Sequence, residues 1–456
     1  MKKSPITLSL LWLLFLSVNG QSPAITSWLQ NTNETGSYYI QGNDTAIDND
    51  ILYNCQRVEY SEDFVYVHTR GIPAYPTGPF QDGNPSIASD QDAIYKIPLN
   101  PVQNNGIPSN TTGGNIGVFI NGVSLFDYRD GVGWNSNTMT ICGGPGNPPC
   151  PGGPMAGSDW NRDAIPAERP GFDCSKAHPA MGNYHHHQNP SAFKLDLEVV
   201  SDICDLYDAD GLYAINTEEH SPLIGYAYDG FPIYGAYGFK NNDGTGGIER
   251  IKSSYQLRDI TTRTTHADGT SVDQGPDVSL TYPLGYFRED YEFVEHPGED
   301  DFLDVHNGRF CITPEYPNGT YAYFATVDEN WNSAYPYVVG PTFYGIPENR
   351  KVESVTEPTM VYDITTSISE PEFNSISLTV FPNPTADLIA VQINGLVQDD
   401  ITVMLVDQLG KLVQTKIIRP GTTISYLNTE TLYAGTYFVK ITSGDYSRAK
   451  KIIIQR

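Results

Sequence analysis

The residues best suited to chemistry in this chain are histidines, and four of them lie within ten positions. His178 is followed by the run His185, His186 and His187, although the 456-residue chain has only nine histidines. An imidazole with an ordinary pKa of about 6.5 is mostly neutral at pH 7, the form that binds metal ions. The cluster therefore indicates a metal site, an acid–base pair or a packed, hydrogen-bonded group.

The spacing of the run separates its members if the segment is extended. Side chains alternate across a strand, so His185 and His187 share one face at a spacing of about 7 Å. Tyr184 and His186 then share the opposite face. Two imidazoles can converge on one ion, but a structural site needs about four ligands and a catalytic site about three plus water. The candidates for the remaining ligands are His178, His220 and Asp229.

A second group of polar and aromatic residues follows in EEHSPLIGYAYDGFPIYGAYGF, residues 218–239. Asp229 and Gly230 predict a tight turn, and Tyr226 and Tyr228 share one strand face. An aromatic platform beside Asp229 would suit a sugar or another flat ligand. His220 with Asp229 could alternatively act as a general base pair. Equally, Asp229 could cap a hairpin while the aromatic rings fill a core.

The charge of the chain restricts its partners and its metals. The formal net charge of −27 argues against nucleic acid, which binds to basic patches. The acidic stretch REDYEFVEHPGEDDFLD, residues 288–304, matches no calcium loop, and the fragment Asp208-Ala209-Asp210-Gly211 is too short to be diagnostic. Imidazole ligands favour copper or zinc. We therefore expect copper or zinc ahead of calcium.

The N-terminus predicts export. MKKSPITLSLLWLLFLSVNGQS places two lysines before an apolar run and small residues near Gly20, as in a secretory signal peptide spanning 1–20. No later segment approaches the roughly 20 apolar residues of a membrane span. Six cysteines in an exported chain suggest disulfides. Cys142 and Cys150 bracket a Gly- and Pro-rich loop, so we expect them to pair.

The composition predicts a mainly β fold with many loops. Forty-two glycines and 33 prolines favour turns and short strands. A large β-rich domain is expected at 25–347, with strands in NGTYAYFAT (Asn318–Thr326) and AFKLDLEVV (Ala192–Val200). A Ser-, Thr-, Glu- and Pro-rich linker follows at 348–374. Regularly spaced apolar runs then predict a small Ig-like β-sandwich at 375–456.

This tail resembles the type A C-terminal sorting domain of the type IX secretion system. The resemblance rests on FPNPTADLIAVQI (381–393), VDQLGKLV (406–413), LYAGTYFVKI (432–441) and the final KKIIIQR. It implies export through the periplasm by the type IX machinery, followed by secretion or attachment to the outer-membrane surface.

The middle of the chain resembles the YHYH family of exported bacterial proteins. The matching segments are GFDCSKAHPAMGNYHHHQNP (171–190), EHSPLIGYAYDGFPIYGAYGF (219–239) and LDVHNGRFCITPEYPNGTYAYF (303–324). The eponymous positions correspond to Tyr184, His185, His186 and His187. This chain departs from the family at His186, where the family has tyrosine. The resemblance implies no established activity.

Three functions remain open from the sequence. The first is an exported metal-binding protein, in which an open site could also activate a bound water for hydrolysis. The second is a non-catalytic surface module that binds a glycan or another polymer. The third is a metal-independent hydrolase that uses a His–Asp pair or paired carboxylates.

Overall fold

The computed structural model divides the chain into two compact units, Met1–Tyr362 and Asp363–Arg456. The expected signal peptide, residues 194–200 of the expected strand and residues 363–374 of the expected linker lie outside the described residues. The structure describes residues 21–80, 87–144, 146–151, 158–193, 202–207, 209–348, 351–362, 377–394, 401–407, 411–419, 424–443 and 446–456.

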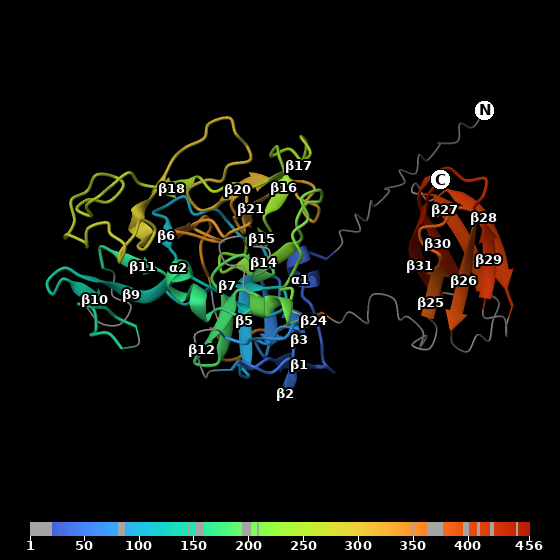
Figure 1. Ribbon diagram of the computed structural model, residues 1–456, viewed down its shortest axis with the longest axis horizontal. Helices are drawn as coiled ribbons and strands as arrows, with labels where there is room; N and C mark the ends of the chain where they lie inside the picture. Colours follow the sequence, from blue (N-terminus) through green and yellow to red (C-terminus); the bar gives the residue numbers. More distant parts are fainter. Residues whose placement is uncertain are drawn as a thin grey trace, which may run out of the picture. The chain divides into compact units, whose positions relative to one another are not determined.

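An eight-stranded mixed sheet forms the centre of the first unit (Figure 1). Its inner strands are buried on both faces, as in β14 and β15, where every residue is buried. Such a sheet requires apolar or hydrogen-bonded side chains on either side. In spatial order the strands are β12 (Ala177–Ala180), β13 (Asn183–His186), β8 (Ser124–Phe126), β7 (Asn115–Phe119), β14 (Leu223–Ala227), β15 (Pro232–Tyr234), β21 (Thr320–Phe324) and β20 (Gly308–Cys311).

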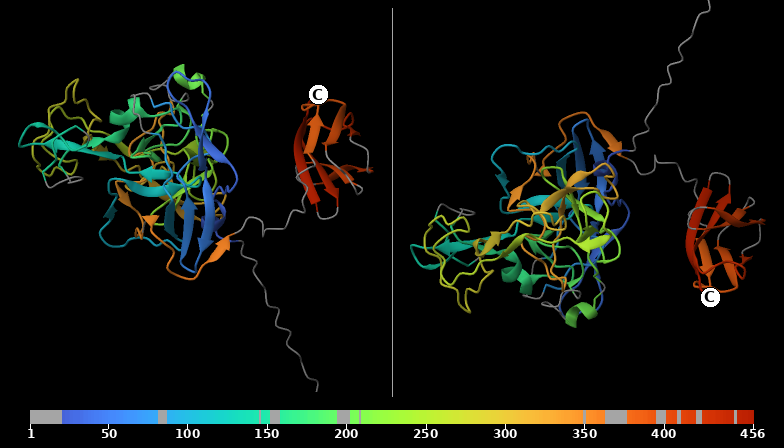
Figure 2. Two further views of the ribbon diagram at one scale, coloured as in Figure 1. Left: turned by 90° about the horizontal axis from the view of Figure 1, so that it is seen from below. Right: turned by 90° about the horizontal axis from the view of Figure 1, so that it is seen from above.

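A five-stranded sheet shares its core with the central sheet. Val58 and Val67 of the five-stranded sheet belong to the same buried cluster as Val118 and Ile224 of the central one. Figure 2 shows the blue strands of this sheet along one side of the unit. The strands in order are β23 (Lys351–Val352), β5 (Ala93–Pro98), β4 (Phe64–Thr69), β3 (Cys55–Tyr60) and β24 (Met360–Tyr362).

Smaller sheets and short helices complete the first unit. A three-stranded sheet has the order β10 (Thr140–Cys142), β9 (Arg129–Asn135) and β11 (Asn161–Asp163). Four strand pairs are β1 (Thr35–Tyr38) with β2 (Ile47–Leu52), β6 (Ser109–Asn110) with β22 (Thr342–Phe343), β16 (Tyr237–Phe239) with β17 (Ile248–Arg250), and β18 (Tyr255–Leu257) with β19 (Tyr291–Phe293). The helices are α1 (Pro23–Thr26), α2 (Ala164–Glu168) and the 3-10 turns η1 (Arg169–Gly171), η4 (Asp202–Asp205) and η5 (Arg288–Asp290).

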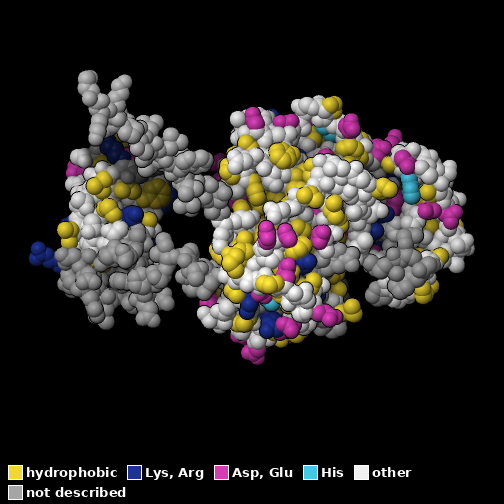
Figure 3. Space-filling model, turned by 180° about the vertical axis from the view of Figure 1, so that it is seen from behind, with side chains coloured by type: hydrophobic (Ala, Val, Ile, Leu, Met, Phe, Trp, Pro, Cys, Tyr) yellow, Lys and Arg dark blue, Asp and Glu magenta, His cyan; other side chains and the backbone are white. Residues whose placement is uncertain are grey.

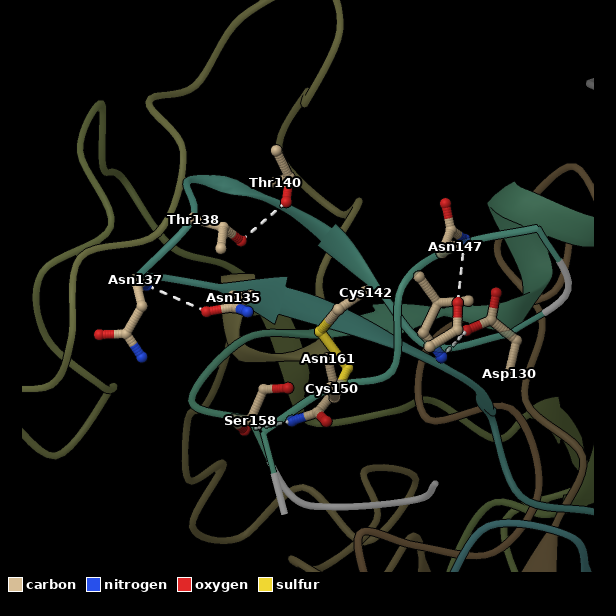
Figure 4. Close-up of a disulfide and its surroundings, with 12 residues drawn as sticks. Asp130, Asn135, Asn137, Thr138, Thr140, Cys142, Asn147, Cys150, Ser158 and Asn161 are labelled. Carbon is tan, nitrogen blue, oxygen red and sulfur yellow. Dashed lines mark hydrogen bonds between the residues drawn. A yellow bond between two sulfur atoms is a disulfide. The ribbon is translucent and has the colours of Figure 1, made fainter. Parts of the chain in front are cut away.

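Two disulfides lie in the first unit. The expected bridge between Cys142 and Cys150 is confirmed, with Cα atoms 4.8 Å apart, and Figure 4 shows it beside β9 and β10. A second bridge joins Cys174 to Cys204 and encloses the histidine-rich segment. Cys55 and Cys311 are buried free thiols.

The second unit is a β-sandwich. Alternating apolar residues such as Ile401, Val403 and Leu405 point into one core between its two sheets. The three-stranded sheet has the order β25 (Ser377–Phe381), β26 (Leu388–Asn394) and β29 (Ile424–Asn428). The four-stranded sheet has the order β28 (Leu412–Ile418), β27 (Ile401–Asp407), β30 (Gly435–Ser443) and β31 (Tyr446–Ile454).

These elements confirm the mainly β fold with a C-terminal sandwich. The first unit reaches Tyr362 because two pieces of the expected linker form the edges of the five-stranded sheet. Lys351–Val352 pairs with β5, and Met360–Tyr362 pairs with β3. Among the described residues, no helix is long and apolar enough to cross a membrane.

Candidate metal centre

A tight hairpin positions the first two histidines of the site. β12 and β13 are joined through Met181 and Gly182, which both have positive φ, at 50° and 83°. Two such residues suit the twist of a two-residue hairpin turn. A Cβ on Gly182 would lie 2.0 Å from Ser89 Oγ, so a larger residue would clash there. The resulting register sets His178 directly opposite His185.

Three histidine rings converge on one point. The Nε2 atoms of His185 and His187 lie 3.1 Å apart. One ring nitrogen from each of His178, His185 and His187 falls within 4.8 Å of the others. Zn–N bonds are about 2 Å long, so two nitrogens on one ion lie at most about 4 Å apart. The His185–His187 pair already has such a spacing, and the group as a whole would need only a small contraction to share an ion. The structure thus brings together three of the four histidines that the sequence nominated.

Backbone carbonyls fix the orientation of two rings. His185 Nδ1 lies 2.9 Å from the carbonyl oxygen of Asn183, and His187 Nδ1 lies 2.5 Å from that of Asp127. A carbonyl only accepts hydrogen bonds, so each Nδ1 carries the proton when the ring is neutral. Each Nε2 then turns its lone pair toward the shared point. This is how outer partners orient histidine ligands around a metal.

A carboxylate that the sequence analysis missed lies beside the group. Glu168 ends α2, and its Oε2 lies 3.1 Å from His187 Nε2 and 3.3 Å from His178 Nε2. Glu168 Oε2 and His178 Nε2 are both buried. An anion at this distance from two histidine nitrogens could act as a further ligand of an ion that they share.

The sequence contains a signal for α2 but not for the role of Glu168. Asp163 caps the helix by accepting a hydrogen bond from the N–H of Ile165 at 2.9 Å, and Pro166 lies in the first turn. An Asp cap followed by a first-turn proline predicts a helix start. Nothing in the segment reveals that Glu168 reaches the histidines.

Aromatic rings enclose the site and leave one side partly open. Phe126 of β8 stacks on His185, with ring centroids 3.7 Å apart, and Phe172 meets His178 edge-on at 5.0 Å. The side chain of His187 is 3% exposed, that of His178 12% and that of Glu168 24%. Solvent therefore approaches from the side of Glu168 and His178.

The protonation behaviour of the group follows from burial and from the carboxylate. Burial, reinforced by His187 and His178, holds the pKa of His185 well below its usual value. Burial also lowers the pKa of His187, but contact with Glu168 outweighs it, so the net pKa is raised. Burial would raise the pKa of Glu168, yet its contacts with His178 and His187 lower it overall. Glu168 is thus an anion at neutral pH, and His185 is a neutral ring.

The opposite face of β13 carries a separate network. His186 Nε2 lies 2.8 Å from the hydroxyl of Tyr75, and burial lowers the pKa of His186 to about 3. The Tyr184 hydroxyl donates to Asp173 at 2.8 Å, and Asp173 also accepts from the N–H of Gly78. His186 and Tyr184 thus lie on the face of the strand opposite to His185 and His187, as the alternation of side chains predicts.

His220 and the expected aromatic platform lie elsewhere. The ring of His220 packs against Tyr234 and Phe239, and its Nδ1 lies 2.7 Å from the carbonyl oxygen of Ser221. His220 does not belong to the group that could hold an ion.

Asp229 and the two tyrosines near it are buried in β14 and in the turn that follows it. Asp229 accepts hydrogen bonds from the Tyr323 hydroxyl at 2.6 Å and the Gly345 N–H at 2.8 Å. Tyr226 is 0% and Tyr228 5% exposed, so neither ring presents a face at the surface.

Part of the acidic stretch makes internal contacts, whereas Glu295, Glu299 and Asp300 are exposed. Asp290 forms a fully buried pair with Arg263 at 2.7 Å, and Asp301 pairs with Lys252 at 2.7 Å. Of the described His, Cys, Asp and Glu residues, His178, His185 and His187 alone form a group of three placed to hold a metal ion.

Comparison with known families identifies the domain. Residues 94–336 match the family described as YHYH protein, a span that covers more than half of the chain. The chain belongs to the YHYH family. In this YHYH protein the metal candidates His185 and His187 are the two histidines of the eponymous motif, and His178 lies outside it.

The second unit has its own match. Residues 379–455 match the secretion system C-terminal sorting domain. This domain implies the type IX secretion machinery as a partner and a secreted or surface-attached protein. No curated protein matches the chain.

Proposed function

We propose that this YHYH protein binds one transition-metal ion through His178, His185 and His187, with Glu168 as the fourth ligand. The observation that carries the proposal is the convergence of three ring nitrogens, with a Glu168 oxygen close to those of His178 and His187. Backbone carbonyls already hold two of the rings in the ligand orientation. The rings of His185 and His187 would therefore have to move little when the metal binds, which lowers the free-energy cost of binding.

The donor set favours copper or zinc. Imidazole nitrogen suits both ions, whereas magnesium and calcium prefer sets made of oxygen. Three imidazoles and one carboxylate carry a single negative charge, which partly neutralises a divalent cation. An additional water or substrate atom would enter from the side of Glu168, where the site is most exposed.

Metal analysis of the purified chain tests the proposal. After stripping with a chelator and reloading with Cu²⁺ or Zn²⁺, we expect about one tightly held ion per chain and an upward shift of the melting temperature. His185→Ala should retain only background metal. His296→Ala is the matched control, because His296 lies at the surface against Phe302 and Glu299. If the unmodified chain retains less than about a tenth of an equivalent of metal after reloading, and its melting temperature does not rise, metal binding is contradicted.

A further inference from the structure

A pocket on the first unit lies outside the histidine group. It has a volume of about 480 Å³, within the range of about 300–1,000 Å³ that is typical of small-ligand sites. Its walls come from α1, the loop after β5, the β14–β15 turn, and β20 with β21. None of the four metal-site residues lines it.

Aromatic rings held in place form part of the pocket wall. Phe310 of β20 is 61% exposed, and its ring lies over Gly319, where a Cβ would approach it to 2.8 Å. Tyr344 stacks on the buried Tyr321 with centroids 3.6 Å apart and planes only 3° from parallel. Such rings lose little freedom on binding, so they offer firm apolar faces.

The polar part of the wall is uncharged. Asn100, Gln103 and Thr320 supply amide and hydroxyl groups, which both donate and accept hydrogen bonds. The pocket contains no lysine or arginine among its lining residues, which argues against an anionic ligand. The formal net charge of −27 is a further obstacle to polyanions, and Figure 3 shows acidic side chains on one face of the first unit.

A second hollow of about 310 Å³ adjoins the first and shares Asn100, Pro101 and Val102 with it. Three carboxylates line it, of which Asp63 and Glu348 are exposed to solvent. The buried Asp229 already accepts hydrogen bonds from Tyr323 and Gly345, so it does not require a cationic partner. Two adjoining hollows suit a ligand built from successive units.

We infer that this pair of hollows binds a neutral oligosaccharide. The apolar face of a sugar ring would pack on Phe310, and its hydroxyl groups would bond to Asn100 and Gln103. The inference is independent of the metal proposal, since the two sets of residues do not overlap. It also places ligand contact on exposed rings, in contrast to the buried Tyr226 and Tyr228.

The test is an array of neutral and acidic oligosaccharides probed with the purified full chain in the presence of a chelator. We expect binding to neutral members, and calorimetry with the best of them should give a Kd about tenfold weaker for Phe310→Ala, as for loss of an aromatic anchor. Phe310→Tyr keeps the ring and should keep the affinity. Leu280→Ala removes a fully exposed side chain outside the pocket and is the matched control.

Several results would overturn the inference. These are a blank array, binding confined to acidic oligosaccharides, or an unchanged Kd in Phe310→Ala. Binding to an oligolysine peptide in place of the sugars would also overturn it. Binding that survives in His185→Ala supports the inference, and binding that disappears in that variant contradicts its independence from the metal site.

Discussion

The Nε2 atoms of His185 and His187 lie 3.1 Å apart, although His186 separates the two residues and points to the other side of the strand. Two nitrogens on one tetrahedral zinc ion, with Zn–N bonds of about 2 Å, are separated by about 3.3 Å. The pair is therefore almost at the spacing that a shared ion requires.

The effect of a substitution in the histidine run on metal affinity should depend on the strand face that carries the side chain. His187→Ala removes a ligand, so we expect metal affinity to fall by more than the 10–100-fold typical of changes to outer partners. His186→Tyr alters the other face and restores the residue that the family has there, so affinity should change by less than about threefold. Competition with a metal-binding dye measures both constants. Equal losses in the two variants would contradict the separation of the faces.

Glu168 should contribute to metal binding through its charge. Glu168→Gln keeps the shape of the side chain but removes the anion beside His178 and His187. We expect zinc affinity to fall by about tenfold or more, and the melting temperature without metal should fall as well because the buried Glu168 oxygen stabilises His187. Isothermal titration with zinc measures the loss. An unchanged Kd would assign Glu168 to packing alone.

Part of this site was predictable from the sequence. The alternation of side chains correctly placed His185 with His187 and His186 apart from them. A turn at Met181–Gly182 would also have located His178, because in a two-residue hairpin residues equally distant from the turn face each other, as His178 and His185 do.

The rest depended on long-range packing. Glu168 reaches the histidines only because β11, α2 and β13 meet in three dimensions, and no local pattern encodes that meeting. His220 was considered as a ligand because it follows the other histidines closely in the sequence. In the structure its ring packs against Tyr234 and Phe239. The fold class was easier, since short alternating runs and turn residues specify β structure locally.

Asp163 should make stability depend on pH. Burial raises its pKa to about 8, although the Tyr337 hydroxyl and the Ile165 N–H donate to it. The folded chain then holds a proton that the unfolded chain releases above its ordinary pKa of 3.8. The contribution of this proton to the free energy of unfolding is therefore fully present below pH 3.8. It decreases as the pH rises and is lost once the pH has passed about 8.

The variant Asp163→Asn mimics the protonated side chain and can still cap α2. Between pH 5 and 8, the stability of the native chain should therefore fall relative to the variant by up to about 1.4 kcal/mol per pH unit. Urea unfolding followed by tryptophan fluorescence reports the first unit, since residues 363–456 contain no tryptophan. The exposed Asp44→Asn is the control. Parallel profiles for Asp163→Asn and the native chain would contradict the raised pKa.

The six cysteines should fall into two classes by their reaction with a thiol reagent, namely free thiols and disulfides. Cys55 and Cys311 are free and fully buried, and burial raises the pKa of both thiols. A thiol reagent should therefore detect none in the native chain and about two after unfolding without reductant. About six under those conditions would mean that the bridges Cys142–Cys150 and Cys174–Cys204 are absent.

The most direct test of the metal proposal is a crystal of the zinc- or copper-loaded chain measured on both sides of the absorption edge of the metal. We predict one anomalous peak about 2.0–2.1 Å from Nε2 of His178, His185 and His187, with an oxygen of Glu168 at about 2.0–2.2 Å. A fully loaded crystal with no peak at these four side chains, or with its peak at other residues, would contradict the account.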